Sequence, residues 1–84
     1  MSYVVRIHRR AGKFIKKLAD EKARARLLDV IESLEHYPAV LRRLDVEKIR
    51  GIERAFRIRV GRYRIVFCVD KKERVIYVTN IFIK

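Results

Sequence analysis

One glycine, Gly61, separates two segments in which apolar residues alternate with residues that are mostly basic. This alternation, over 54–60 and 63–67, has the two-residue period that is typical of half-buried β-strands. A glycine at the first central position suits the two-residue type II′ turn, which joins neighbouring strands into a hairpin. The sequence therefore predicts a β-hairpin across Gly61, with Val60 and Tyr63 as its last paired residues.

This register divides the side chains of the hairpin between two faces of a sheet. The residues that pair on the apolar face are Phe56 with Phe67 and Ile58 with Ile65. The residues that pair on the other face are Arg57 with Val66 and Arg59 with Arg64. Three arginines therefore converge, although like charges opposite each other destabilise a strand pair. Two interpretations stay open at this point: a solvated outer face, or a site that binds anions.

The charge of the whole chain favours a partner that carries phosphates. Its 84 residues include 22 basic and 10 acidic side chains, which give a formal net charge of +12. A surplus of this size on a small chain is the electrostatic footprint of a protein that meets nucleic acid. No linker, repeat or low-complexity segment divides the sequence, so we expect a single domain over residues 1–84.

Several other classes of site find no support in the sequence. Cys68 is the only cysteine, which excludes an internal disulfide and a cysteine-based metal site. His8 and His36 stand alone and no glycine-rich phosphate loop is present, so we expect neither a metal nor a cofactor. No apolar run is long enough for a membrane span and no secretory signal is recognisable. We therefore expect a cytoplasmic protein without membrane contacts.

The segments outside the hairpin predict an α+β fold. The expected elements are a strand over 2–8, a helix over 9–18, a second helix from 20 to 36 or 37, a connection over 39–51 and a last strand over 74–83. Asp20 is the expected N-cap of the second helix, Pro38 ends it, and the connection includes a short turn or an extended piece before Ile49. The expected architecture is an N-terminal strand, a two-helix hairpin and an antiparallel three-strand meander. The helices pack on the apolar face of the meander and leave the arginine face open.

Tyr77 is a candidate for stacking on a nucleic-acid base. A two-residue turn at Lys71 and Lys72 would place it opposite Val66, on the arginine face. Aromatic side chains on an open sheet face are common platforms for the bases of single-stranded RNA. Buried packing of the Tyr77 ring is the alternative interpretation.

The order of these elements and the amino-acid sequence of the hairpin resemble those of the RelE/ParE toxin superfamily, and especially of its archaeal RelE-like members. The resemblance rests on Lys48-Ile49-Arg50-Gly51 and the following residues 56–67, and it extends over nearly the whole chain. It implies a toxin of a type II toxin–antitoxin pair that enters the ribosomal A site. There it would act as an mRNA interferase, an endoribonuclease that uses the ribose 2′-hydroxyl to attack the adjacent phosphate. The implied partners are a cognate antitoxin, in a hetero-oligomer, and the ribosome with its mRNA.

Site residues follow from the resemblance position by position. It implies that Arg64 stabilises the charge that develops on the phosphate, and that Arg57 and Arg59 orient the RNA backbone. Some relatives have a lysine where this chain has Arg59, and a guanidinium with a pKa above about 12 acts by charge rather than as a base. Relatives also continue into a basic segment after the last strand, and Lys84 stands where that segment begins. The expected RNA-binding residues are Arg50, Arg62, Tyr77 and Lys84.

Two further functions are compatible with this sequence. The first is that of a ParE-type toxin, which has the same fold and inhibits DNA gyrase by protein–protein binding without RNA chemistry. The second is that of a non-catalytic module that binds RNA or the ribosome. It would bind RNA in a salt-dependent manner and cleave nothing.

Overall fold

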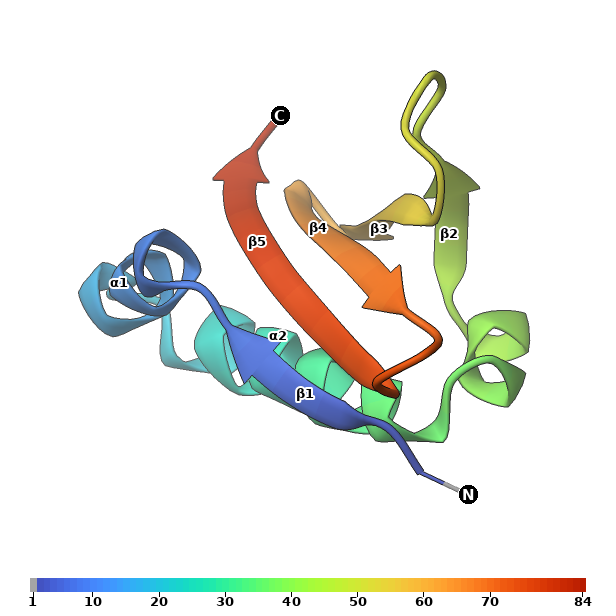
Figure 1. The fold of residues 1–84 in the computed structure, drawn as a ribbon. Helices are drawn as coiled ribbons and strands as arrows, with labels where there is room; N and C mark the ends of the chain where they lie inside the picture. The colour runs from blue at the N-terminus through green and yellow to red at the C-terminus, as the bar shows by residue number, and fades with distance from the viewer. Residues whose placement is uncertain (1) are drawn as a thin grey trace.

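The computed structural model describes residues 2–84, which form a five-stranded sheet with two helices against one face (Figure 1). The strands are β1 (Val4–Ile7), β2 (Asp45–Lys48), β3 (Ala55–Val60), β4 (Tyr63–Asp70) and β5 (Val75–Ile83). The helices are α1 (Arg9–Lys17) and α2 (Glu21–Ser33), followed by two 3₁₀ helices, η1 (Leu34–His36) and η2 (Ala39–Arg43). In the sheet order β1-β5-β4-β3-β2, β1 runs parallel to β5 and the other neighbours are antiparallel. The predicted α+β architecture is confirmed.

The hairpin at the centre of the sheet has the predicted register. Val60 pairs with Tyr63, Ile58 with Ile65, and the remaining pairs of β3 and β4 follow in step. Gly61 has a φ of +58°, whereas Arg62 has a negative φ. A positive φ at the first central position alone is the type II′ pattern, because a type I′ turn needs it at both.

The helices begin and end close to the predicted residues. Asp20 caps α2, because its Oδ1 accepts a hydrogen bond from the backbone N–H of Ala23 at 3.0 Å. The α-helix ends at Ser33, and the 3₁₀ turn of η1 carries the helical path on to His36, shortly before Pro38. Neither α1 nor α2 is long and apolar enough to cross a membrane.

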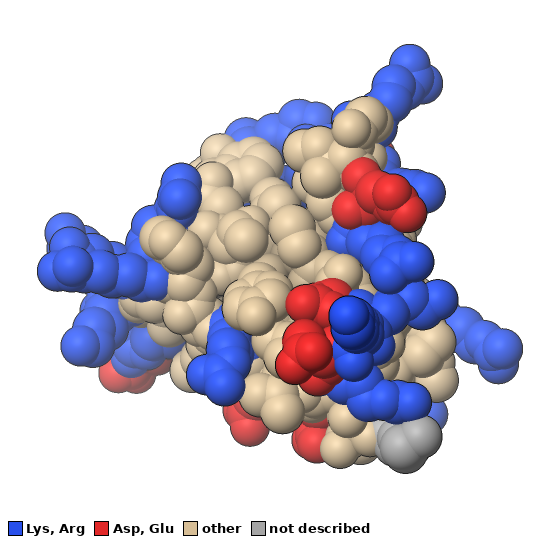
Figure 2. Space-filling model, in the orientation of Figure 1, with Lys and Arg blue, Asp and Glu red and all other residues tan. Residues whose placement is uncertain are grey.

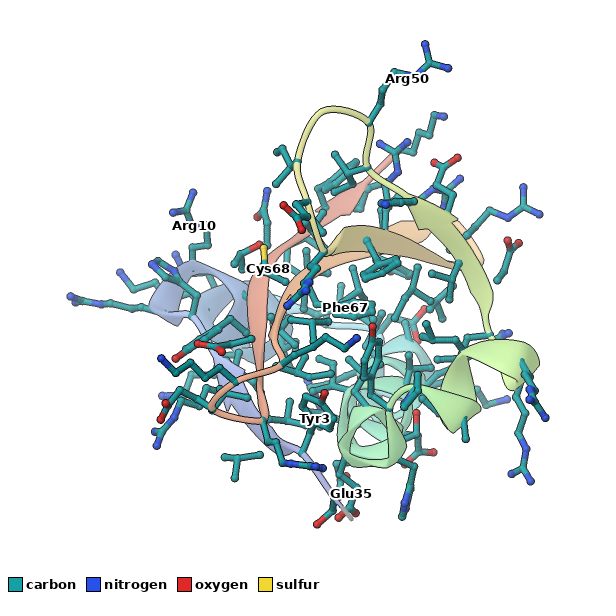
Figure 3. The ribbon with its side chains drawn as sticks, turned by 45° about the vertical axis from the view of Figure 1, so that its right-hand side comes forward. Tyr3, Arg10, Glu35, Arg50, Phe67 and Cys68 are labelled. Atoms are coloured by element: carbon teal, nitrogen blue, oxygen red, sulfur yellow. The ribbon has the colours of Figure 1, made fainter. Side chains whose placement is uncertain are left out.

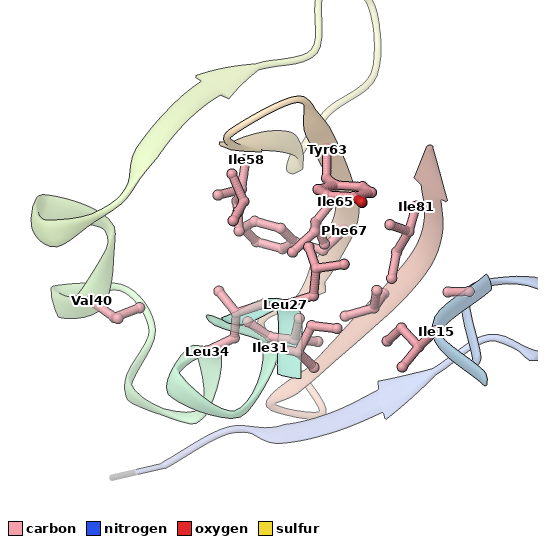
Figure 4. Packing of buried hydrophobic residues seen from close by; sticks show 14 of the residues in the cluster. Ile15, Leu27, Ile31, Leu34, Val40, Ile58, Tyr63, Ile65, Phe67 and Ile81 are labelled. Atoms are coloured by element: carbon pink, nitrogen blue, oxygen red, sulfur yellow. The ribbon is translucent and has the colours of Figure 1, made fainter. Parts of the chain in front are cut away.

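The core lies between the helices and the apolar face of the hairpin, as predicted (Figure 4). Leu27 and Ile31 of α2 are fully buried there with Ile58 and Phe67 of the sheet. Figure 3 shows Phe67 inside the molecule, between the strands and the helical layer. The residues that alternate with these along β3 and β4 therefore face away from the core.

The connection over 39–51 contains a strand of the sheet where the sequence left open a short turn or an extended piece before Ile49. β2 pairs antiparallel with β3 and forms one edge of the sheet, so four antiparallel strands replace the expected three. Its sequence Asp45-Val46-Glu47-Lys48 has only one apolar residue, and Val46 lies half-buried opposite Ile58. An edge strand of four residues needs no more than this one inward side chain, so the usual alternation is absent.

The predicted partner of Tyr77 is wrong, although its predicted place on the arginine face is correct. β4 and β5 are joined by four residues, 71–74, rather than by a two-residue turn, and Arg74 adopts a positive φ of 56°. The side chain of Asp70 supports this longer turn by accepting a hydrogen bond from the backbone N–H of Glu73 at 3.0 Å. The longer turn pairs Tyr77 with Cys68, which alternation along β4 places on the same face as Arg64. A bulge at Thr79 of β5 then shifts the register and places Asn80 opposite Val66.

Candidate functional site

The open face of the sheet contains a hollow in which the hairpin arginines meet other charged side chains. The hollow has a volume of about 210 Å³ and its lining residues are Asp45, Glu47, Arg57, Arg59, Arg64 and Lys84. We call these six residues the arginine site. Four of them are cationic and two are anionic, so the site keeps a net positive charge of two at neutral pH.

Strand periodicity explains why these cations share one face. Arg57 and Arg59 flank the buried Ile58 on β3, so both point away from the core. Arg64 lies directly opposite Arg59 on β4. Lys84 follows β5, and its backbone N–H donates a hydrogen bond to the carbonyl oxygen of Arg62 at 3.0 Å, which holds the last residue beside the hairpin turn.

The helices leave the arginine face uncovered, as predicted, but two of its arginines are paired with carboxylates that were not expected there. The register of β2 places Asp45 opposite Arg59 and Glu47 opposite Arg57. Nε and Nη2 of Arg59 both lie 2.6 Å from Oδ2 of Asp45. Arg57 likewise donates through Nε, at 2.8 Å, and through Nη2 to Oε1 of Glu47. These pairs could not be predicted, because they depend on the register of β2, whose residues show no two-residue period.

Arg64 is held differently from the other two arginines. Its Nη1 donates hydrogen bonds to the carbonyl oxygens of Gly61 and Tyr63, each at 2.9 Å. No carboxylate of residues 2–84 lies within 4.0 Å of its guanidinium group. Backbone carbonyls of the turn thus orient Arg64 without neutralising its charge.

The charges of the arginine site change the pKa of Glu47. The hydrogen bond and the charge of Arg57, together with the charge of Lys84, hold the pKa of Glu47 below its ordinary value. Glu47 is therefore ionised throughout the neutral pH range, and its carboxylate is a weaker base than an isolated glutamate. Both ion pairs are exposed, and exposed pairs contribute little to the stability of a fold.

Three of the predicted RNA-binding residues lie outside the arginine site. Arg50 is in the β2–β3 loop, where Figure 3 shows it projecting away from the sheet. Arg62 is in the hairpin turn with its guanidinium carbon 5.5 Å from the centre of the Tyr63 ring, a cation–π geometry. Tyr77 is 41% exposed and lies between Cys68 and Arg6, towards β1. Only Lys84 of this group joins the three hairpin arginines.

A second basic surface covers the outer side of α1. Its members, which we call the α1 basic face, are Arg9, Arg10, Lys13, Lys16 and Lys17. All five are exposed, and within the described chain none lies within 4.0 Å of a carboxylate. Figure 2 shows blue side chains extending from α1 at the left, beside a tan field that overlies β5. Their helical spacing was visible in the sequence, but nothing in it separates a binding surface from a solvated one.

Residues 2–84 contain no group of three His, Cys, Asp or Glu side chains that could hold a metal ion. The arginine site offers three guanidinium groups on one face of the sheet. A guanidinium group presents two parallel N–H donors along one edge, which fit two oxygens of a phosphate. Cations projecting from neighbouring strands can hold a phosphodiester between them and stabilise extra negative charge on it.

Comparisons with known proteins agree with the fold and the hairpin. Residues 5–82 match the family model described as the ParE toxin of type II toxin–antitoxin systems, parDE. A curated protein of Methanocaldococcus jannaschii, provisionally named toxin RelE1, is 27% identical over 81 residues, which cover 96% of this chain and 89% of that protein.

Solved structures of toxin–antitoxin complexes contain chains with the same fold. A chain of the archaeal RelE–RelB complex from Pyrococcus horikoshii superposes with a TM-score of 0.84 at 29% identity, covering 99% of this chain and 96% of that chain. A chain of the RelB–RelE antitoxin–toxin complex from Methanococcus jannaschii superposes with a TM-score of 0.76 at 26% identity, covering 93% and 88%. Because the family model spans most of the sequence, the chain belongs to the ParE toxin family of type II toxin–antitoxin systems, within the RelE/ParE superfamily.

Proposed function

We propose that this chain is a RelE-type toxin that cleaves ribosome-bound mRNA at the arginine site and thereby stops translation. The observation that carries the proposal is the meeting of Arg57, Arg59, Arg64 and Lys84 in one hollow on the outer face of the sheet. Similarity to proteins named RelE supports it. The net charge of +12 fits a protein that enters an RNA-rich machine.

The proposed reaction is transfer of a phosphodiester within the RNA strand. The 2′-oxygen forms a bond to the adjacent phosphorus, the bond to the 5′-oxygen breaks, and a 2′,3′-cyclic phosphate and a 5′-hydroxyl result. Negative charge builds on the phosphate oxygens in the transition state, and preorganised donors aimed at that charge are the main catalytic means open to this site. Arg64 supplies this charge stabilisation, while Arg57 and Arg59 orient the phosphate. A guanidinium group stays protonated in proteins, so none of them accepts the 2′-hydroxyl proton.

Four further side chains would extend the RNA-binding surface. Lys84 adds a cation within the hollow beside the scissile phosphate, whereas Arg50 and Arg62 lie in loops that reach neighbouring phosphates. Tyr77 offers an exposed ring on the same sheet face, towards β1, where a base of the bound strand can stack. In this arrangement Tyr77 contacts a nucleotide that is separated from the one being cleaved.

The proposed regulator is a cognate antitoxin chain that covers the basic outer face of the sheet, with the arginine site, and neutralises the toxin. The superposed archaeal structures are complexes of RelE with RelB, which supports a partner of this kind. Co-expression with the gene of a small acidic neighbour should restore growth. The same neighbour should co-purify with the toxin as a hetero-oligomer.

The test is induction of the chain in cells, followed by measurement of growth, translation and mRNA 5′ ends. The wild type should stop growth and produce new mRNA ends at codons occupied by ribosomes. Arg64→Ala should remove both effects, while Asp29→Asn, which changes an exposed charge on α2, should leave them intact. Unchanged growth and intact mRNA, or full toxicity of Arg64→Ala, would contradict the proposal.

A ParE-type function is the second candidate, because the matching family model is described as the toxin of parDE. In that case the toxin inhibits DNA gyrase by binding it and leaves mRNA intact. A supercoiling assay with purified gyrase separates the two, since only the ParE-type function predicts inhibition. Salt-dependent RNA binding without cleavage in any ribosome assay would instead indicate the non-catalytic module.

A further inference from the structure

The arginine site contains its own anions. Asp45 and Glu47 belong to the edge strand β2, and each lies beside an arginine proposed to hold the RNA phosphate. Their direction is fixed by register, because Val46 between them faces the core opposite Ile58. A slip of one residue would reverse these directions, so the register of β2 decides that both carboxylates face the site.

The two ion pairs use the same edge of each guanidinium group. Arg57 donates to Glu47 through Nε and Nη2, and Arg59 donates to Asp45 through Nε, with its Nη2 in ion-pair contact with the same carboxylate oxygen. This paired edge is the one that clamps phosphate oxygens in bidentate recognition. A phosphate that takes either arginine by this edge must therefore displace the carboxylate already bound there.

A purely structural role does not account well for these pairs. The side chains of Asp45 and Glu47 are 55% and 63% exposed, and exposed ion pairs contribute little to stability. Arg64 makes its hydrogen bonds to backbone carbonyls and has no carboxylate beside it within the described chain. The site thus combines one oriented cation that is open to an incoming phosphate with two that are already occupied.

We propose that Asp45 and Glu47 act as built-in competitors for the RNA phosphate and lower the affinity of the free toxin for RNA. This inference rests on the proposed function of the arginine site as the place where the phosphodiester binds. A phosphate first meets Arg64 and Lys84, and it gains Arg57 and Arg59 only by replacing the two carboxylates. Free RNA strands are then held weakly, and stable engagement requires a strand that other contacts keep in place, as on the ribosome.

The experiment compares RNA binding by two double variants with equal charge. Asp45→Asn/Glu47→Gln removes the competitors and keeps their size, whereas Asp29→Asn/Glu32→Gln removes two exposed acids of α2 that make no ion pair with residues 2–84. The probe is a short, fluorescently labelled 2′-O-methyl RNA strand, which cannot undergo 2′-hydroxyl attack. Binding is measured by fluorescence anisotropy at about 0.15 M ionic strength, where charges more than about 8 Å away are largely screened.

The proposal expects Asp45→Asn/Glu47→Gln to bind the probe about 3- to 30-fold more tightly than the wild type. The α2 control should change affinity less than about twofold, because its charges lie away from the site and are screened. Equal tightening in both variants would show a general charge effect and overturn the proposal. Unchanged or weaker binding by Asp45→Asn/Glu47→Gln would also overturn it, since the carboxylates would then position the arginines for RNA.

A second measurement follows the displacement in the wild-type protein. When the probe is added, the Nε–Hε resonances of Arg57 and Arg59 and the carboxyl carbon of Glu47 should shift together in NMR spectra. Probe binding that leaves these resonances unmoved would contradict displacement. Failure of the wild type to cleave mRNA on ribosomes would contradict the proposed function. The comparison of RNA affinities between the two double variants could still be interpreted. Failure of every variant to bind the probe would overturn the proposed competition but not the proposed function, which cleavage on ribosomes tests separately.

Discussion

The arginine site and the α1 basic face both gather cations, but they hold them in opposite ways. At the arginine site the hairpin arginines come from adjacent strands, and each guanidinium group has a fixed acceptor, either a carboxylate or a backbone carbonyl. On α1 the cations follow helical spacing and extend into water without a carboxylate partner among residues 2–84. The number of cations therefore does not by itself distinguish the two surfaces. They differ in whether each cationic side chain has a fixed acceptor.

The difference teaches how a basic surface becomes a site. Fixed donors on a rigid sheet act on one phosphate in a defined orientation, which is what transition-state stabilisation requires. Mobile lysines on a helix attract any nearby phosphate and fix no geometry, which suits binding of an RNA backbone without regard to sequence. We therefore expect changes in the arginine site to affect reaction rate and changes in the α1 basic face to affect affinity.

The largest effect on stability is expected from a change in the core, which supports both the arginine site and the α1 basic face. Phe67 is fully buried beneath the hairpin, and Phe67→Ala should lower the free energy of unfolding by about 3–5 kcal/mol. Urea denaturation followed by circular dichroism measures this loss. Arg64 is half-buried on the outer face of the sheet, and Arg64→Ala, which leaves the core intact, should unfold near the wild-type midpoint. A comparable loss in both variants would mean that Arg64 has a structural role.

A change confined to the α1 basic face should alter affinity and its dependence on salt. Lys13→Ala/Lys16→Ala/Lys17→Ala should weaken binding of single-stranded RNA about tenfold at low salt. The slope of log K against log salt should fall by about 2, because each single-strand phosphate contact contributes about 0.7. A titration at several salt concentrations checks this. An unchanged slope would indicate that these lysines are only solvated.

Asp20 offers a change in stability that involves neither surface. Its carboxylate caps α2 through the backbone N–H of Ala23, so Asp20→Ala should cost about 1 kcal/mol of stability. Thermal unfolding should show a lower midpoint. RNA binding well below that midpoint should match the wild type, and a parallel loss of binding would mean that the surfaces are sensitive to any destabilisation.

The smallest effect concerns the dependence of stability on pH. Because Arg57 holds the pKa of Glu47 below its ordinary value, the carboxylate stabilises the folded state above its unfolded pKa. That contribution disappears as the pH falls through the lowered folded pKa. The difference in thermal midpoint between wild type and Glu47→Gln should therefore be present at neutral pH and vanish in strong acid. A difference that is constant with pH would rule out ionisation as its cause.

Much of the fold could be predicted because Gly61 and the alternating residues around it fix a register. That register also identified Arg57, Arg59 and Arg64 as neighbours on one face. The carboxylate partners could not be predicted, because β2 has one apolar residue and no visible period. The partner of Tyr77 was missed for a different reason, since it depends on a four-residue turn with a positive φ at Arg74, which a residue pattern does not specify.

Single-turnover cleavage of ribosome-bound mRNA at saturating toxin tests the central claim most directly, that RNA is cleaved at the arginine site and only held by the α1 basic face. Arg64→Ala should cleave about 10²- to 10³-fold more slowly than the wild type. Lys13→Ala/Lys16→Ala/Lys17→Ala should reach the wild-type rate, though at a higher toxin concentration. A wild-type rate for Arg64→Ala, or a rate lost through the lysines and not regained at saturation, would contradict the claim.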